Sequence, residues 1–192
     1  MFNSFLASFD RYSHVSDMDR ERIASLVHIE RLKKDAFFVR EGQVCRKIAF
    51  VIKGMMRHYY LTEKGDITRW VTLENNFATS LYSFILQKPS FENLQAIQDS
   101  ELIILPHSAW EALMKEQTVF KEIWTKHMEE NYLGMEERVF YLISKSAEER
   151  YHHLLKSNPE FIQKVPLIFL ASMLGTTPRH LSRIRKSLHL HL

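Results

Sequence analysis

The sequence predicts an α+β protein, in which a β-roll of the jelly-roll kind is followed by one long helix and then by a pair of short helices. Three observations predict this class. Short β-branched and aromatic runs recur between residues 36 and 105, with turn residues between them. A largely apolar stripe with spacings of three and four runs from residue 120 to residue 142. Residues 170–186 then show two helical patterns separated by Gly-Thr-Thr-Pro.

The predicted roll is preceded by a helix that begins at Ser16, a good N-cap with acidic residues in the turn that follows. Strict alternation over residues 67–73 predicts one inward and one outward set of side chains. Short, regularly spaced strands are typical of a jelly roll. The strands are predicted at residues 36–39, 48–52, 56–61, 67–73 and 94–105. We expect the roll in residues 1–117, a connecting helix in residues 118–145 and a further domain in residues 146–192, whose first helix is capped by Ser146-Ala147-Glu148-Glu149.

Composition limits the class of protein. The 192 residues are 45% hydrophobic, which is enough for packed cores. No stretch approaches the roughly 18 apolar residues that span a bilayer. Cys45 is the only cysteine, so an intrachain disulfide, a multi-thiolate zinc site and a cysteine-ligated iron–sulfur cluster are excluded. We therefore expect a cytoplasmic protein with no membrane partner.

The long helix carries an apolar stripe that has two interpretations. It either packs on the roll of its own chain, or it forms a seam with a second copy in which Asn131 is a polar, register-setting position. A stripe of this length exceeds what a small sheet domain covers, which favours a homodimer. The stripe residues are Phe120, Trp124, Met128, Asn131, Met135 and Val139, followed by Leu142.

The C-terminal pattern predicts two helices that pack on each other through a tight turn. Gly175 supplies the left-handed conformation that ends the first helix, and Thr177 and Pro178 suit the N-cap and first position of the second. The small side chain of Ala171 allows the two helices to cross closely. The faces expected to be buried carry Leu167, Leu170, Ala171 and Leu174 in the first helix, and Leu181, Ile184 and Leu188 in the second.

The opposite face of the second helix is basic, and the chain has five Lys or Arg and no Asp or Glu after Glu160. This face is either a solvated surface or a contact with phosphate and bases of DNA. Agreement between the turn, the cap and the acid-free face favours a DNA-reading helix-turn-helix. Arg183 is then the expected guanine reader, and Thr177 a phosphate contact. Arg179 and Ser182 are expected at bases or phosphates, and Arg185 and Lys186 at the DNA backbone.

The chain resembles the Crp/Fnr family of bacterial transcription regulators. The resemblance is carried by "VREGQ", "FVIKGMMRHYYLTEKGD", the helix of residues 118–145 and "LASMLGTTPRHLSRIRK". It implies a homodimer whose cyclic-nucleotide-binding-like roll senses an effector, and whose two reading helices bind a near-palindromic operator in double-stranded DNA. RNA polymerase is a further partner that the resemblance implies. Many relatives continue into a β-hairpin wing, where only residues 187–192 follow here.

The effector cassette departs from the members of that family that bind cyclic AMP. Their Gly-Glu pair, which holds the ribose, falls on Thr79-Ser80, and their Arg-Ser pair, which holds the phosphate, falls on Ser90-Phe91. A phosphate buried without its cation is costly, so we do not expect control by cyclic AMP. Either an uncharged ligand or a filled core suits this region. Its candidate residues are Phe77, Thr79, Ser80, Leu81, Tyr82, Lys88 and Ser90.

Other classes of function are weaker. A cupin-type metal enzyme requires paired histidines and an acid, which His58 lacks at suitable spacing, so no metal site is predicted. No nucleophile arrangement or phosphate-binding glycine loop is present, so we do not expect an enzyme. Haem ligation by Cys45 or a histidine stays open, although no spacing favours it, and no cofactor is predicted. A sensing or protein-interaction module that does not read DNA is the remaining alternative.

Overall fold

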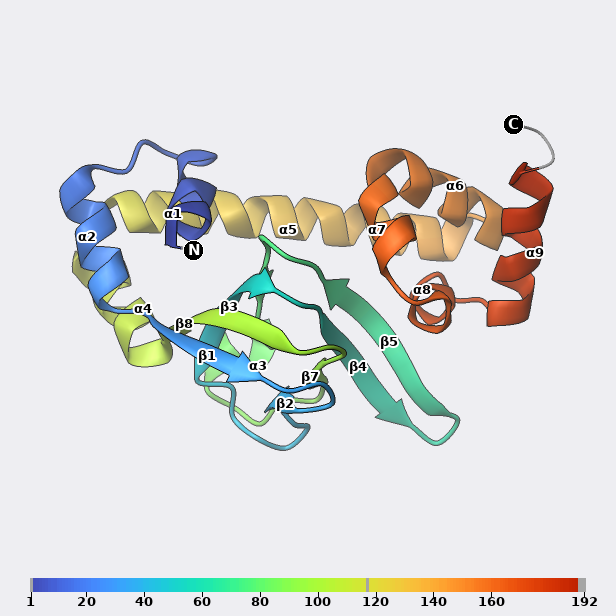
Figure 1. The fold of residues 1–192 in the computed structure, drawn as a ribbon, viewed down its shortest axis with the longest axis horizontal. Helices are drawn as coiled ribbons and strands as arrows, with labels where there is room; N and C mark the ends of the chain where they lie inside the picture. Colours follow the sequence, from blue (N-terminus) through green and yellow to red (C-terminus); the bar gives the residue numbers. More distant parts are fainter. Residues whose placement is uncertain (1, 117, 190–192) are drawn as a thin grey trace.

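The computed structural model describes residues 2–116 and 118–189. A long helix, α5, crosses the whole molecule (Figure 1), with the β-roll packed along one half and the C-terminal helices gathered around the other. Within the described residues no helix is both long and apolar enough to cross a bilayer. The helices are α1 (Phe2–Asp10), α2 (Asp17–Ser25), α3 (Leu81–Leu86), α4 (His107–Glu116), α5 (Thr118–Ser144), α6 (Ala147–Ser157), α7 (Pro159–Lys164), α8 (Leu167–Met173) and α9 (Pro178–His189).

The roll consists of two antiparallel four-stranded sheets that enclose an apolar core. Short strands of Val, Ile, Phe and Leu suit this arrangement because both sheets turn one face inward. One sheet has the order β1 (His28–Leu32), β8 (Ser100–Pro106), β3 (Lys47–Lys53), β6 (Phe77–Ala78). The other has the order β2 (Phe37–Val39), β7 (Asn93–Ala96), β4 (Met56–Thr62), β5 (Gly65–Thr72). The prediction of a jelly-roll-like domain is confirmed.

The local helix signals are also confirmed. Ser16 Oγ accepts a hydrogen bond from the amide of Asp19 and caps α2. Ser146 and Glu149 form a complete capping box at the start of α6. Both caps join residues three positions apart, so the local sequence is sufficient to predict them.

The N-terminal helix α1 and the strand β1 were not predicted. Phe5 and Phe9 of α1 lie edge to face with each other. Phe5 contacts Phe50 and Phe77 of the roll and Phe9 contacts Phe77, with ring centroids 5.5–6.3 Å apart. A nine-residue helix is marginal in isolation, so these contacts with the roll stabilise it. The apolar spacing of residues 2, 5, 6 and 9 was the available signal.

The prediction of strict alternation along β5 was wrong. The register with β4 pairs His58 with Trp70 and Tyr59 with Thr68, so Arg69 is an extra, bulged residue. A bulge inserts one extra residue into the strand. The alternation of inward and outward side chains before the bulge is therefore out of phase with the alternation after it. The bulge turns Arg69 toward the interior of the roll and leaves Trp70 and Val71 packed against the C-terminal helices.

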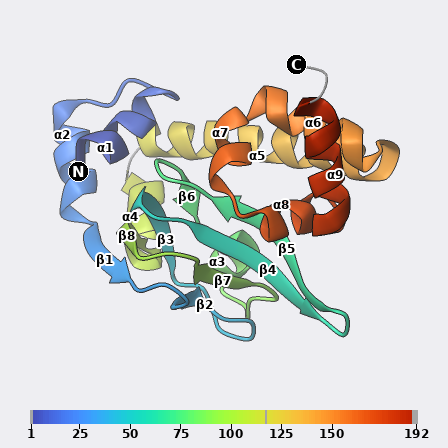
Figure 2. The same ribbon diagram turned by 45° about the vertical axis from the view of Figure 1, so that its right-hand side comes forward.

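The C-terminal helices are docked on β4 and β5 of the roll, and α8 lies beside β5 in both ribbon views (Figure 2). The Trp70 ring lies 5.0 Å from that of Phe161 in α7. The buried Arg57 guanidinium lies 4.3 Å from the ring of Phe169 in α8. The amide of Thr68 donates to Ser172 Oγ at 2.9 Å. The roll and the C-terminal helices therefore share one continuous apolar and polar interface.

Replacing Gly54 with alanine is expected to destabilise the roll more than the same change at Gly65. Both residues have left-handed φ angles, +107° and +108°, so the backbone strain is the same. A Cβ on Gly54 would lie 2.7 Å from the backbone Cα of Ser100, whereas a Cβ on Gly65 meets nothing within 4 Å. We expect Gly54→Ala to lose about 1–3 kcal/mol more in urea unfolding. Equal losses in the two variants would contradict the close approach.

Candidate nucleic-acid interface and sensor roll

The turn between α8 and α9 is built as the sequence predicts. Gly175 has a φ of +60°. The amide of Thr176 donates to Ala171 O and that of Gly175 to Ser172 O, which is the Schellman pattern of helix ends. Thr177 Oγ1 accepts from the amide of His180 at 3.2 Å and so caps α9. The direction in which α9 leaves the domain is therefore set by local hydrogen bonds.

Burial of one face fixes which side of α9 meets solvent. Leu181 and Ile184 are 0% and 5% exposed and pack in one cluster with Leu170 and Ala171 of α8. Arg179, Arg183 and Lys186, together with Thr177 and His180, are exposed, whereas Ser182 is half-buried. The side chain of Leu188, predicted to be buried, lies outside the described residues. The structure thus brings three of the predicted cations into one exposed row.

Arg185 does not belong to that row, and its predicted contact with the DNA backbone is corrected. Its Nη2 donates to the carbonyl of Ile162 at 3.0 Å, and its guanidinium lies 5.8 Å from the Tyr151 ring. The residue follows the buried Ile184 and is turned toward the body of the domain. Arg185 therefore ties α9 to α7 and α6.

The apolar stripe of α5 has two different environments. Phe120 is 4% exposed beside Phe9 of α1, and the Trp124 ring lies 5.2 Å from that of Trp110 in α4. These two residues pack within their own chain, so their assignment to an intermolecular seam is corrected. Asn131 Nδ2 donates to the carbonyl of His127 at 2.7 Å.

One side of the C-terminal half of α5 is apolar and uncovered, while Arg138 and Tyr141 on its other side contact the C-terminal helices. Met128 is half-buried, Met135 and Val139 are 45% and 47% exposed, and Ile143 is 81% exposed. Tyr132, Leu133, Phe140 and Leu142 add further exposed apolar surface to this half of the helix. An exposed apolar face of this size usually contacts another surface.

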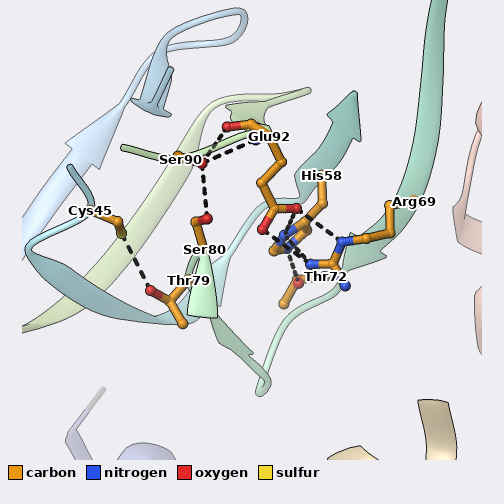
Figure 3. Close-up of polar contacts among 8 residues, drawn as sticks. All are labelled: Cys45, His58, Arg69, Thr72, Thr79, Ser80, Ser90 and Glu92. Atoms are coloured by element: carbon orange, nitrogen blue, oxygen red, sulfur yellow. Dashed lines mark hydrogen bonds and ion pairs between the residues drawn. The ribbon is translucent and has the colours of Figure 1, made fainter. Parts of the chain in front are cut away.

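Hydroxyl groups occupy the positions where the relatives that bind cyclic AMP carry their ribose and phosphate contacts, and these groups form hydrogen bonds within the protein. Ser80 Oγ and Ser90 Oγ lie 2.9 Å apart, and both residues are at least 98% buried (Figure 3). Ser90 Oγ also donates to Glu92 O, and Thr79 Oγ1 donates to the carbonyl of Lys47. The hydroxyl groups at these positions are therefore satisfied by the protein itself.

The other candidate effector residues are not gathered around one pocket. Phe77 packs between Phe5 and Phe9 of α1, with its ring 5.4 Å from that of His127, so its assignment to an effector pocket is corrected. Leu81 and Tyr82 lie on the exposed side of α3, and Lys88 is exposed beyond its end. The unpredicted helix α1 occupies the space against Phe77.

A buried polar cluster on the second sheet was also missed. Arg69 Nε and Nη2 donate to Glu92 Oε2 and Oε1 at 2.9 and 3.4 Å (Figure 3). Arg69 Nη2 also lies 3.2 Å from His58 Nδ1, and His58 Nε2 lies 2.9 Å from Thr72 Oγ1. His58, the residue a metal enzyme would use, therefore has both ring nitrogens engaged. The sequence around His58 gives no signal for this cluster, because its partner Glu92 lies 34 positions further along the chain.

Burial and the positive charge of Arg69 set the protonation states of His58 and Glu92. Burial lowers the pKa of His58, so its imidazole is neutral at pH 7. Burial acts to raise the pKa of Glu92, but hydrogen bonds and charges of His58 and Arg69 outweigh it and lower that pKa to about 2. Since His58 is neutral at pH 7, Arg69 is the cation that keeps Glu92 ionised there.

Stability is expected to fall as the pH is lowered through the acid range. The unfolded chain protonates His58 below about pH 6.5 and Glu92 below about pH 4.5, while the folded chain resists both until lower pH. In this window the unfolded state binds more protons, so acid favours unfolding. Urea midpoints measured from pH 7 to pH 3 test this, and His58→Gln should flatten the decline between pH 6.5 and pH 5. A midpoint independent of pH would contradict it.

Comparisons with known proteins agree with this architecture. Residues 29–117 match the family of the cyclic nucleotide-binding domain, which covers the roll. No curated protein matches the sequence significantly. The roll is therefore a cyclic nucleotide-binding-like domain in fold and in sequence pattern.

Solved structures share the arrangement of the whole chain. A protein assigned to the Crp/Fnr family of transcriptional regulators, from Eubacterium rectale, is similar with a TM-score of 0.68 and 18% identity over 96% of this chain and 88% of that one. FixK2 from Bradyrhizobium japonicum is similar with a TM-score of 0.69 and 19% identity over 86% and 85%. A CooA mutant from Carboxydothermus hydrogenoformans is similar with a TM-score of 0.69 and 17% identity over 87% and 78%. The fold is that of Crp/Fnr regulators.

Proposed function

We propose that this chain is a homodimeric, sequence-specific DNA-binding transcription regulator of the Crp/Fnr type. In this proposal α8, the turn at Gly175 and α9 are a helix-turn-helix unit, and α9 enters the major groove. The observation that carries it is the exposed row of Arg179, Arg183 and Lys186 on a helix whose start is fixed by the Thr177 cap. The fold shared with Crp/Fnr regulators supports the same assignment.

The chemistry of the row suits DNA at each position. Arg183 has the planar fork that pairs with guanine O6 and N7. Thr177, at the first turn of α9, lies where helix amides and a hydroxyl group bind phosphate. Lys186 and Arg179 add charge, so affinity should fall steeply as salt concentration rises. A regulator of this kind acts in the cytoplasm, and RNA polymerase is a further proposed partner.

The proposed dimer is formed by the uncovered side of the C-terminal half of α5. Met135, Val139 and Leu142 recur at spacings of four and three along one face, as in a two-stranded seam, and the exposed Ile143 extends this face. Two-fold symmetry would place the two reading helices about 34 Å apart, which is one turn of DNA. The operator should therefore be a near-palindrome.

We do not assign cyclic AMP as the effector. The Ser80 and Ser90 hydroxyl groups are bonded to each other, and Glu92 already neutralises Arg69. A cyclic phosphate would have to displace these contacts without gaining a bidentate cation. A ligand at about 1,000 times its Kd raises the free energy of unfolding by about 4 kcal/mol. We expect cyclic AMP at millimolar concentration to change neither Tm nor DNA affinity. A rise in either would overturn this part of the proposal.

Selection from random duplex DNA tests the function directly. Purified protein is incubated with a random library without added effector, and the retained duplexes are sequenced. A two-fold symmetric motif is the expected result. Retention with no shared motif, both alone and with cell extract, would contradict DNA reading and favour a protein-contact module. The exposed apolar side of α3, with Ile85 and Leu86 at 41% and 50% exposure, is the surface such a module would use.

A further inference from the structure

The reading face of α9 carries hydrogen-bond donors and almost no acceptors. The helix sequence PRHLSRIRKSLH contains no Asp, Glu, Asn or Gln. Its exposed positions in the first three turns are Arg179, His180, Arg183 and Lys186, following Thr177 and Pro178. The buried face of Leu181 and Ile184 holds these side chains outward.

Donors of this kind select one base. Guanine presents two acceptors, O6 and N7, to the major groove, and the arginine fork pairs with both. Adenine is read by the amide of Asn or Gln, and cytosine by a carboxylate. Because α9 has neither group, its direct base contacts are limited to guanine and to single hydrogen bonds.

The spacing of the two arginines sets the spacing of the guanines. Arg179 and Arg183 are one helical turn apart, a rise of about 6 Å along α9. Successive bases along one DNA strand are about 3.4 Å apart, so the two forks meet bases about two steps apart. Lys186 lies a further turn along the helix and offers only a point charge, which suits phosphate better than a base edge.

The Arg183 fork contacts His180. Arg183 Nη2 donates to His180 Nδ1 at 3.3 Å. The amide of His180 is in turn bonded to Thr177 Oγ1, so the imidazole rises from the capped first turn of the helix. Holding a long arginine side chain in one pose lowers the rotamer entropy that it loses on binding.

We propose that each half-site contains two guanines about two base pairs apart, read by Arg179 and Arg183, and that His180 is a positioning residue for Arg183. This inference rests on the proposed DNA-binding function and adds its sequence preference. Arg179 and His180 become determinants of specificity along with Arg183.

Selections with wild type and five exposed-position variants test the proposal, with circular dichroism to verify folding. Arg179→Ala and Arg183→Ala should each lower the preference for a different guanine by about 10- to 100-fold. Lys186→Ala, the control, should weaken all sequences equally. His180→Leu should lower only the Arg183 guanine preference, several-fold. His180→Asn should restore it, because the amide oxygen replaces Nδ1 as acceptor.

The outcomes distinguish a failure of the sequence preference from a failure of DNA binding itself. A shared motif without paired guanines at this spacing overturns the sequence preference but leaves DNA reading intact. His180→Asn behaving like His180→Leu overturns the positioning role. Retained DNA with no shared motif overturns the proposed function, and this inference with it.

Discussion

Replacing Ile143 with aspartate is expected to convert the protein from a dimer to a monomer and to abolish tight operator binding. Ile143 is 81% exposed on α5, on the same face as Val139 and Met135, so a carboxylate there would be buried unpaired in the seam. Two linked reading helices gain about 10²- to 10⁴-fold in avidity over one. We therefore expect a loss of that order in operator affinity, measured by fluorescence anisotropy alongside sedimentation velocity.

The control for this variant is Met18→Asp. Met18 is similarly exposed, at 76%, but lies on α2 and not on α5. It should keep both the sedimentation coefficient and the operator affinity of wild type. Val139→Asp, one turn before Ile143, should reproduce the monomer. If Ile143→Asp still sediments as a dimer, the C-terminal half of α5 is not the seam.

Replacing Glu92 with glutamine is expected to destabilise the roll by about 3 kcal/mol in urea unfolding at pH 7. Glu92 is 4% exposed and bonds Arg69 through both oxygens. The neutral amide leaves the Arg69 guanidinium, whose side chain is 24% exposed, without its counter-charge. Breaking one member of a buried pair costs more than the pair itself is worth.

The double variant Arg69→Met/Glu92→Met separates charge from packing. Since both ions are removed and apolar volume replaces them, we expect it to recover most of the stability that Glu92→Gln loses. Glu101→Gln, which breaks the surface pair with the 79% exposed Arg31, should cost less than about 1 kcal/mol. A Glu92→Gln variant as stable as Glu101→Gln would show that the cluster contributes no more than a surface ion pair.

Much of the fold is predictable from short-range patterns. The Ser16 and Ser146 caps, the Gly175 turn and the Thr177 cap were read correctly because each joins residues within five positions of one another. Apolar runs likewise located most strands of the roll. α1 and β1 were missed because their stability comes from contacts with distant parts of the chain, such as Phe5 with Phe50.

In the candidate DNA-binding site, too, some positions follow from local sequence and others depend on distant contacts. The outward row of Arg179, Arg183 and Lys186 follows from helical spacing and from the burial of its opposite face. Arg185, one residue from this row, is drawn to the carbonyl of Ile162, 23 positions away. Spacing alone gives no information about that partner.

By itself, therefore, the sequence determined the class of fold, the turn that presents α9 and the basic, acid-free chemistry of its exposed face. Only the tertiary structure decided that Phe120 and Trp124 pack in their own chain, that Ser80 and Ser90 satisfy each other, and that Arg69 is paired with Glu92. The physical reason is the range of the interactions. Caps, turns and helical faces are set by neighbours in the chain, whereas the partner of a buried polar or apolar group is set by which distant segments the sheets bring together.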